Sequence, residues 1–179
     1  NAGITRDRML FNMSDEDWDL VIAVHLRGHF LLTRNAATYW RNKSKEAGGS
    51  VYGRLINTSS EAGLVGPVGQ ANYGAAKAGI AQLTKTLAIA WAADRIRVNA
   101  VAAGLIRSNM TAAMLADETL TAPFMSRVPL ARVGTPHDIA GAVLFLSSPA
   151  ASYITGSKLR QSLVISRLRA RISSERSIA

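Results

Sequence analysis

The sequence contains no cysteine and no long apolar run, and aromatic residues make up only 6% of it. The lack of cysteine excludes disulfide bonds, thiolate metal sites and cysteine nucleophiles. No apolar stretch approaches the roughly 20 residues that cross a bilayer, and the first residues lack the basic and then apolar order of a signal peptide. We therefore expect a cytoplasmic protein with no membrane partner.

Histidine is also scarce, with only His25, His29 and His137 in the chain. His25 and His29 are four residues apart, which is too little for a metal-binding set, so we expect no metal and interpret the pair as structural. The dinucleotide fingerprint Gly-x-Gly-x-x-Gly is missing as well. The glycines of residues 63–69 instead predict a loop that lines a substrate site.

Basic residues are concentrated at one end of the chain. The net charge is +9, and residues 157–179 hold six basic residues and one acidic residue, so +5 lies in that segment. Elsewhere the basic residues are dispersed among acidic ones and are not interleaved with aromatic residues, as they would be on a nucleic-acid surface. We expect no nucleic-acid partner, with binding to nucleic acid or a membrane surface through the basic segment as a minor alternative.

The apolar spacing predicts alternating helices and strands in a single domain. A chain of 179 residues with 48% hydrophobic content can bury a sizeable core. Strands that alternate with helices are typical of an α/β fold with a parallel sheet. The expected order is a helix over 14–40, a strand over 51–59, a helix over 72–93, a strand over 98–103, a helical excursion over 110–129 and a helix from Thr135.

Ser60, Tyr73 and Lys77 form the clearest chemical pattern. Tyr73 and Lys77 are four apart in a predicted helix, so they share one face and the ammonium can lower the pKa of the phenol. Ser60 follows the predicted strand and can hydrogen-bond the same substrate oxygen. The trio suits proton transfer to a carbonyl or from an alcohol. Tyr-x-x-x-Lys alone is also common as an ordinary amphipathic pair on a helix. The surrounding motifs therefore decide between this interpretation and a catalytic one.

Those motifs resemble the short-chain dehydrogenase/reductase family over residues 1–156, most strongly its 3-oxoacyl-thioester reductases and 3-hydroxyacyl-thioester dehydrogenases. The resemblance implies a Rossmann-type doubly wound parallel sheet that lacks its N-terminal nucleotide-binding half. Residues 157–179 depart from the family and are expected to form an atypical basic tail. The motifs are Asn1-Ala-Gly-Ile-Thr-Arg-Asp7, Val24-His-Leu-Arg-Gly28, Asn57-Thr-Ser-Ser60, Gln70-Ala-Asn-Tyr-Gly-Ala-Ala-Lys77-Ala-Gly79, Arg97-Val-Asn-Ala-Val101 and Tyr153-Ile-Thr-Gly156.

The resemblance implies an oxidoreductase that uses NAD or NADP to interconvert a carbonyl and a secondary alcohol, with 3-oxoacyl and 3-hydroxyacyl thioesters as expected substrates. Tyr73 would donate and accept the proton, Ser60 would orient the carbonyl, and Lys77 would tune Tyr73 and hold the nicotinamide ribose. His25 stands where most members have an asparagine that supports a water chain to the lysine. It is therefore a candidate relay residue through its backbone carbonyl, with a packing role as the alternative.

Two further segments would contact the cofactor. By resemblance, one is the strand end at residues 1–3 on the adenosine side, and the other is 104–108, where a serine hydroxyl replaces the usual threonine at the carboxamide. The residues implied are Asn1, Ala2, Gly3, Tyr73, Lys77, Gly104, Ile106 and Ser108. Apolar residues of 110–129, such as Met110, would suit an acyl chain under a lid, with core packing as an equal alternative.

Assembly is the last implication of the resemblance. Family members pair the helices that correspond to residues 14–40 and 72–93, so we expect a homo-oligomer, a dimer or a tetramer. The main alternative is a catalytically incompetent fragment that retains only these assembly contacts. At the C-terminal side, residues 163–165 could form a short strand, and the chain after 166 is expected to be poorly ordered or helical.

Overall fold

The computed structural model describes residues 2–49 and 51–161 of the chain. Three strands alternate with helices along the sequence, as the apolar pattern predicts. The strands are β1 (Arg54–Ser60), β2 (Arg97–Ala103) and β3 (Lys158–Arg160). The helices and turns are η1 (Leu10–Asn12), α1 (Asp15–Ile22), the π-helical turn η2 (Ala23–Arg27), α2 (Gly28–Glu46), α3 (Ala62–Val65), α4 (Ala71–Ala90), α5 (Ala112–Leu115), α6 (Glu118–Met125), α7 (Pro136–Ser147) and η3 (Pro149–Ala151).

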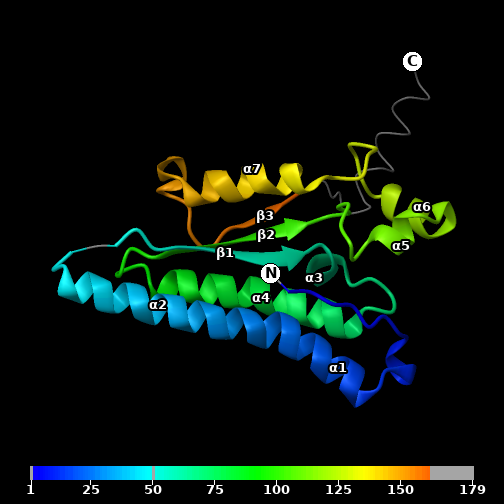
Figure 1. The fold of residues 1–179 in the computed structure, drawn as a ribbon, viewed down its shortest axis with the longest axis horizontal. Coiled ribbons are helices and arrows are strands. Elements are labelled where there is room, and N and C mark those ends of the chain that lie inside the picture. The colour runs from blue at the N-terminus through cyan, green and yellow to red at the C-terminus, as the bar shows by residue number, and fades with distance from the viewer. Residues whose placement is uncertain (1, 50, 162–179) are drawn as a thin grey trace, which may run out of the picture.

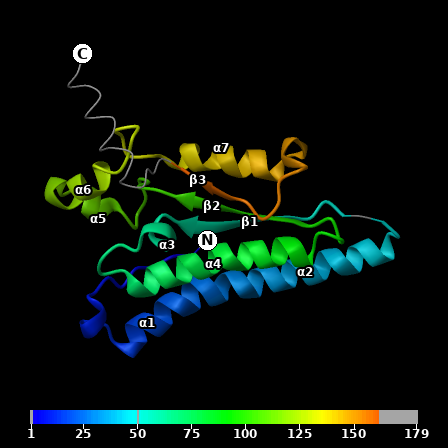
Figure 2. The ribbon, with the colours of Figure 1, turned by 180° about the vertical axis from the view of Figure 1, so that it is seen from behind.

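The strands form one parallel sheet in the order β1-β2-β3. Helices α1, α2 and α4 lie on one side of the sheet and α7 lies on the other, and the view from behind shows the same arrangement (Figures 1 and 2). A parallel sheet with helices on both faces confirms the predicted α/β, doubly wound fold class. The ends of β1 and β2 lie side by side, with Ser60 opposite Ala103.

The core lies between β2 and α4. Residues 97–102 of β2 are all buried, as expected for the central strand of a parallel sheet. On α4, small side chains such as Ala76, Ala81 and Ala88 are buried and let the helix approach the strands closely. Ala88 packs with Ile96 and Val98 in one cluster. This packing fixes α4, and the polar residues near its start, against the strand ends.

The helix expected over 14–40 begins as predicted but ends later. Ser14 caps α1, its Oγ accepting a hydrogen bond from the Asp17 N–H at 3.2 Å. The helix then passes through the π-helical turn η2 and continues to Glu46, so the end expected near Trp40 is wrong. Residues 41–46 are polar but contain no glycine or proline, and the chain leaves the helix only near Gly48, whose φ is +59°.

The other elements differ from the expected ranges by only a few residues. β1 begins at Arg54 instead of residue 51, and α4 ends at Ala90 instead of residue 93. The excursion over 110–129 contains the short helices α5 and α6. The helix expected from Thr135 is α7, and Thr135 and Asp138 form a capping box at its start, with Pro136 at the first helical position.

The third strand lies in the segment that the sequence analysis separated as a tail. β3 pairs with β2 in parallel, with Lys158 opposite Ala100 and Arg160 opposite Ala102. The strand expected at residues 163–165, the chain after 166 and most of the basic segment lie outside the described residues. Within the described ranges, no helix has the length and apolar character to cross a membrane.

Candidate active site

Ser60, Tyr73 and Lys77 come together at the C-terminal end of β1. Ser60 is the last residue of that strand, and Tyr73 and Lys77 lie one turn apart near the start of α4. The Ser60 side chain acts on Tyr73 directly, since its hydrogen bonding lowers the pKa of the phenol. Nζ of Lys77 lies 5.5 Å from the centroid of the Tyr73 ring. The pattern in the sequence is therefore a single group in space.

His25 lies directly beside Tyr73. The two ring centroids are 5.0 Å apart and the ring planes meet at 88°, an edge-to-face contact. Nε2 of His25 is 2.8 Å from the carbonyl oxygen of Ile4, and the side chain is only 1% exposed. Burial lowers the pKa of His25, and the contact with the Ile4 carbonyl only partly opposes this shift. His25 therefore packs against Tyr73 as a neutral ring at pH 7.

The electrostatics of Tyr73 differ from the expectation. Burial raises the pKa of Tyr73, and the hydrogen bond with Ser60 lowers it by a smaller amount. The hydrogen bond of Lys77 does not go to the phenol, since its Nζ donates to the carbonyl of Thr58 at 2.9 Å. The prediction that Lys77 lowers the pKa of the phenol is therefore wrong for this structure. Tyr73 carries its proton at neutral pH and can donate it.

Burial also affects Lys77. The side chain is 4% exposed, and burial lowers the pKa of its ammonium to about 8. An ammonium carries three N–H donors, and the Thr58 carbonyl uses one of them. The remaining donors can bind oxygen atoms brought in by a ligand.

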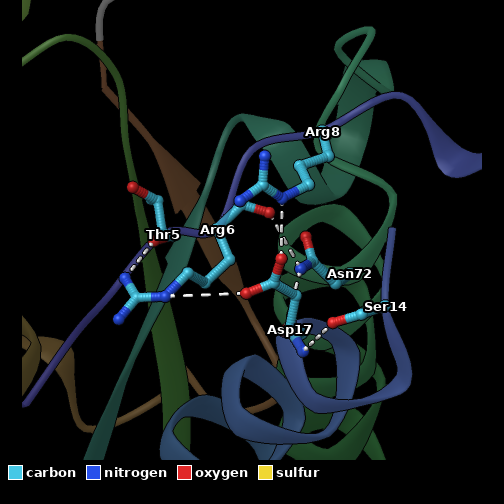
Figure 3. A network of polar contacts seen from close by, with 6 residues as sticks. All are labelled: Thr5, Arg6, Arg8, Ser14, Asp17 and Asn72. Carbon is cyan, nitrogen blue, oxygen red and sulfur yellow. Dashed lines mark hydrogen bonds and ion pairs between the residues drawn. The ribbon is translucent and has the colours of Figure 1, made fainter. Parts of the chain in front are cut away.

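A polar network holds the start of α4 just before Tyr73 (Figure 3). Asn72 is fully buried, and its Nδ2 donates to the backbone carbonyls of Arg6 and Asp17, each at 3.2 Å. Its Oδ1 accepts a hydrogen bond from the Tyr73 N–H at 2.7 Å. The Asp17 carboxylate pairs with Nε of Arg8 at 2.8 Å and with Nε of Arg6 at 3.7 Å. The N-terminal segment and α1 therefore meet α4 at the residue before Tyr73.

The N-terminal segment expected at the cofactor reaches the same place. Gly3 faces His25 and Met110, and a Cβ at this position would lie 2.9 Å from Cε of Met110 and 3.3 Å from Cε1 of His25. A larger residue would displace one of these side chains. Ala2 is exposed, and Asn1 lies outside the described residues.

The second expected cofactor segment, residues 104–108, begins beside the trio at the end of β2. Gly104 directly follows Ala103, which is paired with Ser60. Gly104 and Ile106 line a cavity of about 240 Å³ whose described lining does not include Tyr73 or Lys77. Oγ of Ser108 lies 3.1 Å from Oγ1 of Thr111. The structure thus brings Gly104 next to the trio and leaves Ile106 and Ser108 further along the same segment.

Comparisons with known proteins identify the family. A family model of short-chain dehydrogenases, described as Enoyl-(Acyl carrier protein) reductase, matches residues 1–161. The hydroxyacyl-CoA dehydrogenase ChsB1 of Mycobacterium tuberculosis is 60% identical over 162 residues, which cover 87% of this chain and 48% of ChsB1. The chain belongs to the short-chain dehydrogenase/reductase family.

Other short-chain dehydrogenases match over the same region. The 3-oxoacyl-[acyl-carrier-protein] reductase FabG of Thermotoga maritima is 46% identical over 156 residues, covering 87% of this chain and 60% of FabG. A solved 4-hydroxyisoleucine dehydrogenase in complex with NADH has a TM-score of 0.82 at 31% identity, and the match covers 89% of this chain and 63% of that one. A solved protein of Agrobacterium tumefaciens with bound NADP, assigned as a 2-deoxy-D-gluconate 3-dehydrogenase, has a TM-score of 0.80 at 40% identity, with the same coverage of 89% and 63%. The chain spans about half of ChsB1 and less than two thirds of the others.

The donor set of this chain fits the nicotinamide end of a dinucleotide. The Lys77 ammonium retains donors for the hydroxyls of a ribose, and Tyr73 and Ser60 present hydroxyls beside it. Among the described residues, no group of three histidine or carboxylate side chains could hold a metal ion.

Sequence reasoning missed several residues that contact the trio or support the residues next to it. Asn72 and Asp17 support the start of α4, Thr58 accepts the hydrogen bond of Lys77, and His29 contacts the backbone at Thr58. A signal for His29 existed in the four-residue spacing from His25. The contacts of Thr58 had no signal because both involve its backbone.

Proposed function

We propose that this chain carries the proton-transfer site of an NAD(P)-dependent oxidoreductase that interconverts 3-oxoacyl and 3-hydroxyacyl thioesters. The observation that supports this most directly is the convergence of Ser60, Tyr73 and Lys77 at the end of β1. The names of ChsB1 and FabG supply the substrate class, because both act on acyl groups carried as thioesters.

The roles of the three residues follow from their environments. Tyr73, protonated because burial raises its pKa, donates a proton to the carbonyl oxygen during reduction and takes it back during oxidation. Ser60 hydrogen-bonds the same oxygen and fixes its direction. Lys77 holds ribose hydroxyls through the donors that the Thr58 carbonyl leaves unused. NAD or NADP, when bound, supplies or accepts the hydride.

The proposal extends to the cofactor contacts and the assembly. Gly3, Gly104, Ile106 and Ser108 would contact the cofactor, and Asn1 and Ala2 belong to the same predicted set. NADH and NADP in the related structures support either form of the cofactor. A homo-oligomer through helices 14–40 and 72–93 is supported by exposed apolar side chains on these helices, including Leu20, Phe30, Leu32 and Ile89. The proposed location is cytoplasmic, as in the sequence-based prediction.

One observation supports a second candidate function. The chain covers only 48% of ChsB1, and its sequence holds no Gly-x-Gly-x-x-Gly turn to bind a pyrophosphate. In that alternative, the 179-residue chain is catalytically incompetent and retains only contacts with other subunits. The two candidates differ in whether the chain binds nicotinamide cofactor.

The test is a titration of the chain with NADH and NADPH, followed by nicotinamide fluorescence, and then an assay of acetoacetyl thioester reduction. Saturable binding together with turnover that Tyr73→Phe abolishes would support the oxidoreductase. Tyr39→Phe is the matched control, because Tyr39 is exposed on α2, and it should leave turnover unchanged. No binding, or equal turnover by Tyr73→Phe and the unmodified chain, would refute the proposal and favour the assembly role.

A further inference from the structure

The edge of β1 that faces away from β2 is covered at Thr58 by two side chains. Along this strand, the carbonyl of Gly53 and the N–H of Glu61 bond to β2. Because backbone groups alternate between the two edges of a strand, Thr58 directs its N–H and carbonyl to the opposite edge. There the N–H donates to Nε2 of His29 at 3.3 Å, and the carbonyl accepts from Nζ of Lys77 at 2.9 Å.

The second nitrogen of His29 contacts a different element. Nδ1 lies 2.7 Å from the backbone carbonyl oxygen of His25, one turn earlier. Nε2 accepts the Thr58 N–H, so the neutral ring must carry its proton on Nδ1 and donate it to His25. His29 therefore joins the turn that carries His25 to the strand that ends in Ser60.

The local helix geometry is irregular around the His25 carbonyl. Residues 23–27 form a π-helical turn, and the N–H of Gly28 reaches back to the carbonyl of Ala23, five residues earlier, as well as to that of His25. Such a turn shifts carbonyls away from their usual α-helical partners, and π-turns often mark functional sites. The carbonyl of His25 is the one that the family resemblance assigns to a water, and here the ring of His29 lies against it.

We propose that His29 is a positioning residue for the group formed by Ser60, Tyr73 and Lys77. It touches no reacting atom and acts through the backbone of Thr58, whose N–H meets His29 and whose carbonyl accepts the hydrogen bond of Lys77. Ser60 follows two residues later, so a shift of the backbone at Thr58 moves both the serine and the lysine. The inference rests on the proposed function for its catalytic consequence, but not for the geometry of the contact.

The protonation state of His29 decides whether the contact can form. Among the described residues, the titratable groups that face it are His25 in the π-helical turn and Lys77 on α4. Burial lowers the pKa of His29, the hydrogen bond with the His25 carbonyl raises it less, and the charge of Lys77 lowers it further. The ring is therefore neutral at pH 7. Below its pKa, Nε2 gains a proton and can no longer accept the Thr58 N–H.

Three variants separate positioning from simple packing. His29→Phe removes both hydrogen bonds, whereas His29→Gln keeps an amide oxygen that can accept the Thr58 N–H and does not titrate. His29→Asn lacks any atom at the ε position and replaces the Phe variant if that one does not fold. The matched control is His137→Gln, because His137 is exposed at the start of α7.

The first readout needs no turnover. NMR of the Lys77 ¹³Cε follows the titration of its ammonium, and NMR of the His29 ring nitrogens identifies the tautomer. We expect the Nδ1–H tautomer in the unmodified chain. We also expect a Lys77 titration that shifts in His29→Phe but not in His29→Gln or His137→Gln. Coincident Lys77 titration curves in all four proteins would overturn the inference. Because this readout does not depend on turnover, its outcome is separate from that of the proposed function.

The second readout is kinetic and applies where the unmodified chain turns over. His29→Phe should lower kcat about tenfold with a smaller change in KM, since a small misplacement of catalytic groups affects the chemical step most. His29→Gln should have a kcat near that of the unmodified chain, and its activity should fall less at acid pH than that of the unmodified chain. Equal kcat and an unchanged acid profile in His29→Phe would contradict the positioning role.

Discussion

Lys77 donates a hydrogen bond to the carbonyl of Thr58 at 2.9 Å, while burial lowers the pKa of its ammonium to about 8. The lysine therefore sits in a place that satisfies one of its donors and disfavours its charge. An ammonium with such a pKa is mostly charged at pH 7 and largely neutral above pH 9. Its ability to hold an oxygen ligand by charge should decline over the same range.

The stability of the chain should rise with pH because of Lys77. Its pKa in the unfolded chain is near 10.5, so between about pH 8 and 10 the unfolded state binds more protons and the free energy of unfolding increases. From pH 7.5 to 9.5 the gain should be about 1–2 kcal/mol relative to Lys77→Met. Urea unfolding of both proteins at the two pH values measures it, and parallel pH dependences would show that Lys77 is not the cause.

The buried amide of Asn72 should matter more for stability than the ion pairs of Asp17. Asn72→Ala leaves two backbone carbonyls and the Tyr73 N–H without their partner inside the protein, which costs about 1–3 kcal/mol. Asp17→Asn weakens pairs with Arg6 and Arg8, whose side chains are about half exposed, and should cost less than about 1 kcal/mol. Urea unfolding at pH 7 compares them, and an equal loss in both variants would contradict this ranking.

Alanine should have opposite effects at two helical glycines. A Cβ on Gly63 of α3 would lie 2.6 Å from the backbone of Lys77 and Ala78, so Gly63→Ala forces α3 away from α4 and should cost about 1–3 kcal/mol. Gly141 of α7 has no atom within 4 Å of such a Cβ, and Gly141→Ala should stabilise the helix by about 0.5–1 kcal/mol. Thermal unfolding of the two variants gives both signs, and a destabilised Gly141→Ala would disprove the second part.

Arg97 should be essential for the segment that follows α7. Its guanidinium is buried, and it donates to the backbone carbonyls of Ala151 and of Ser148, the latter at 2.9 Å. Arg97→Met removes the bonds from the buried guanidinium and leaves each carbonyl with a single backbone donor, which should cost about 1–3 kcal/mol. The exposed Arg107 provides the control, since Arg107→Met should change stability by less than about 0.5 kcal/mol. Urea unfolding measures both, and similar midpoints for the two variants would contradict this role.

The sequence located the site because its spacing has geometric meaning. Tyr73 and Lys77 are four apart, and a helix requires them to share a face, while the apolar run before Ser60 places that residue at a strand end. The helix start at Thr135 could be predicted for the same reason, since the capping chemistry there is local. Contacts between nearby residues in the chain follow from the sequence alone.

The features that the sequence did not reveal depend on distant or backbone contacts. The rise in the pKa of Tyr73 comes from burial by the folded surroundings, and spacing alone suggested the opposite direction. The π-helical turn at residues 23–27 contains no glycine or proline to mark it. His29 and Thr58 are 29 residues apart, and their contact uses a backbone N–H that carries no residue signature.

The occupied edge at Thr58 also limits what can pair with the sheet. A strand added in parallel along β1 would meet backbone groups as far as Ile56, but at Thr58 both groups already belong to His29 and Lys77. Such a strand would have to stop pairing there and turn away from the sheet. The side chains of His29 and Lys77 thus end strand pairing along this edge at Thr58, and they keep a neighbouring backbone from covering Ser60.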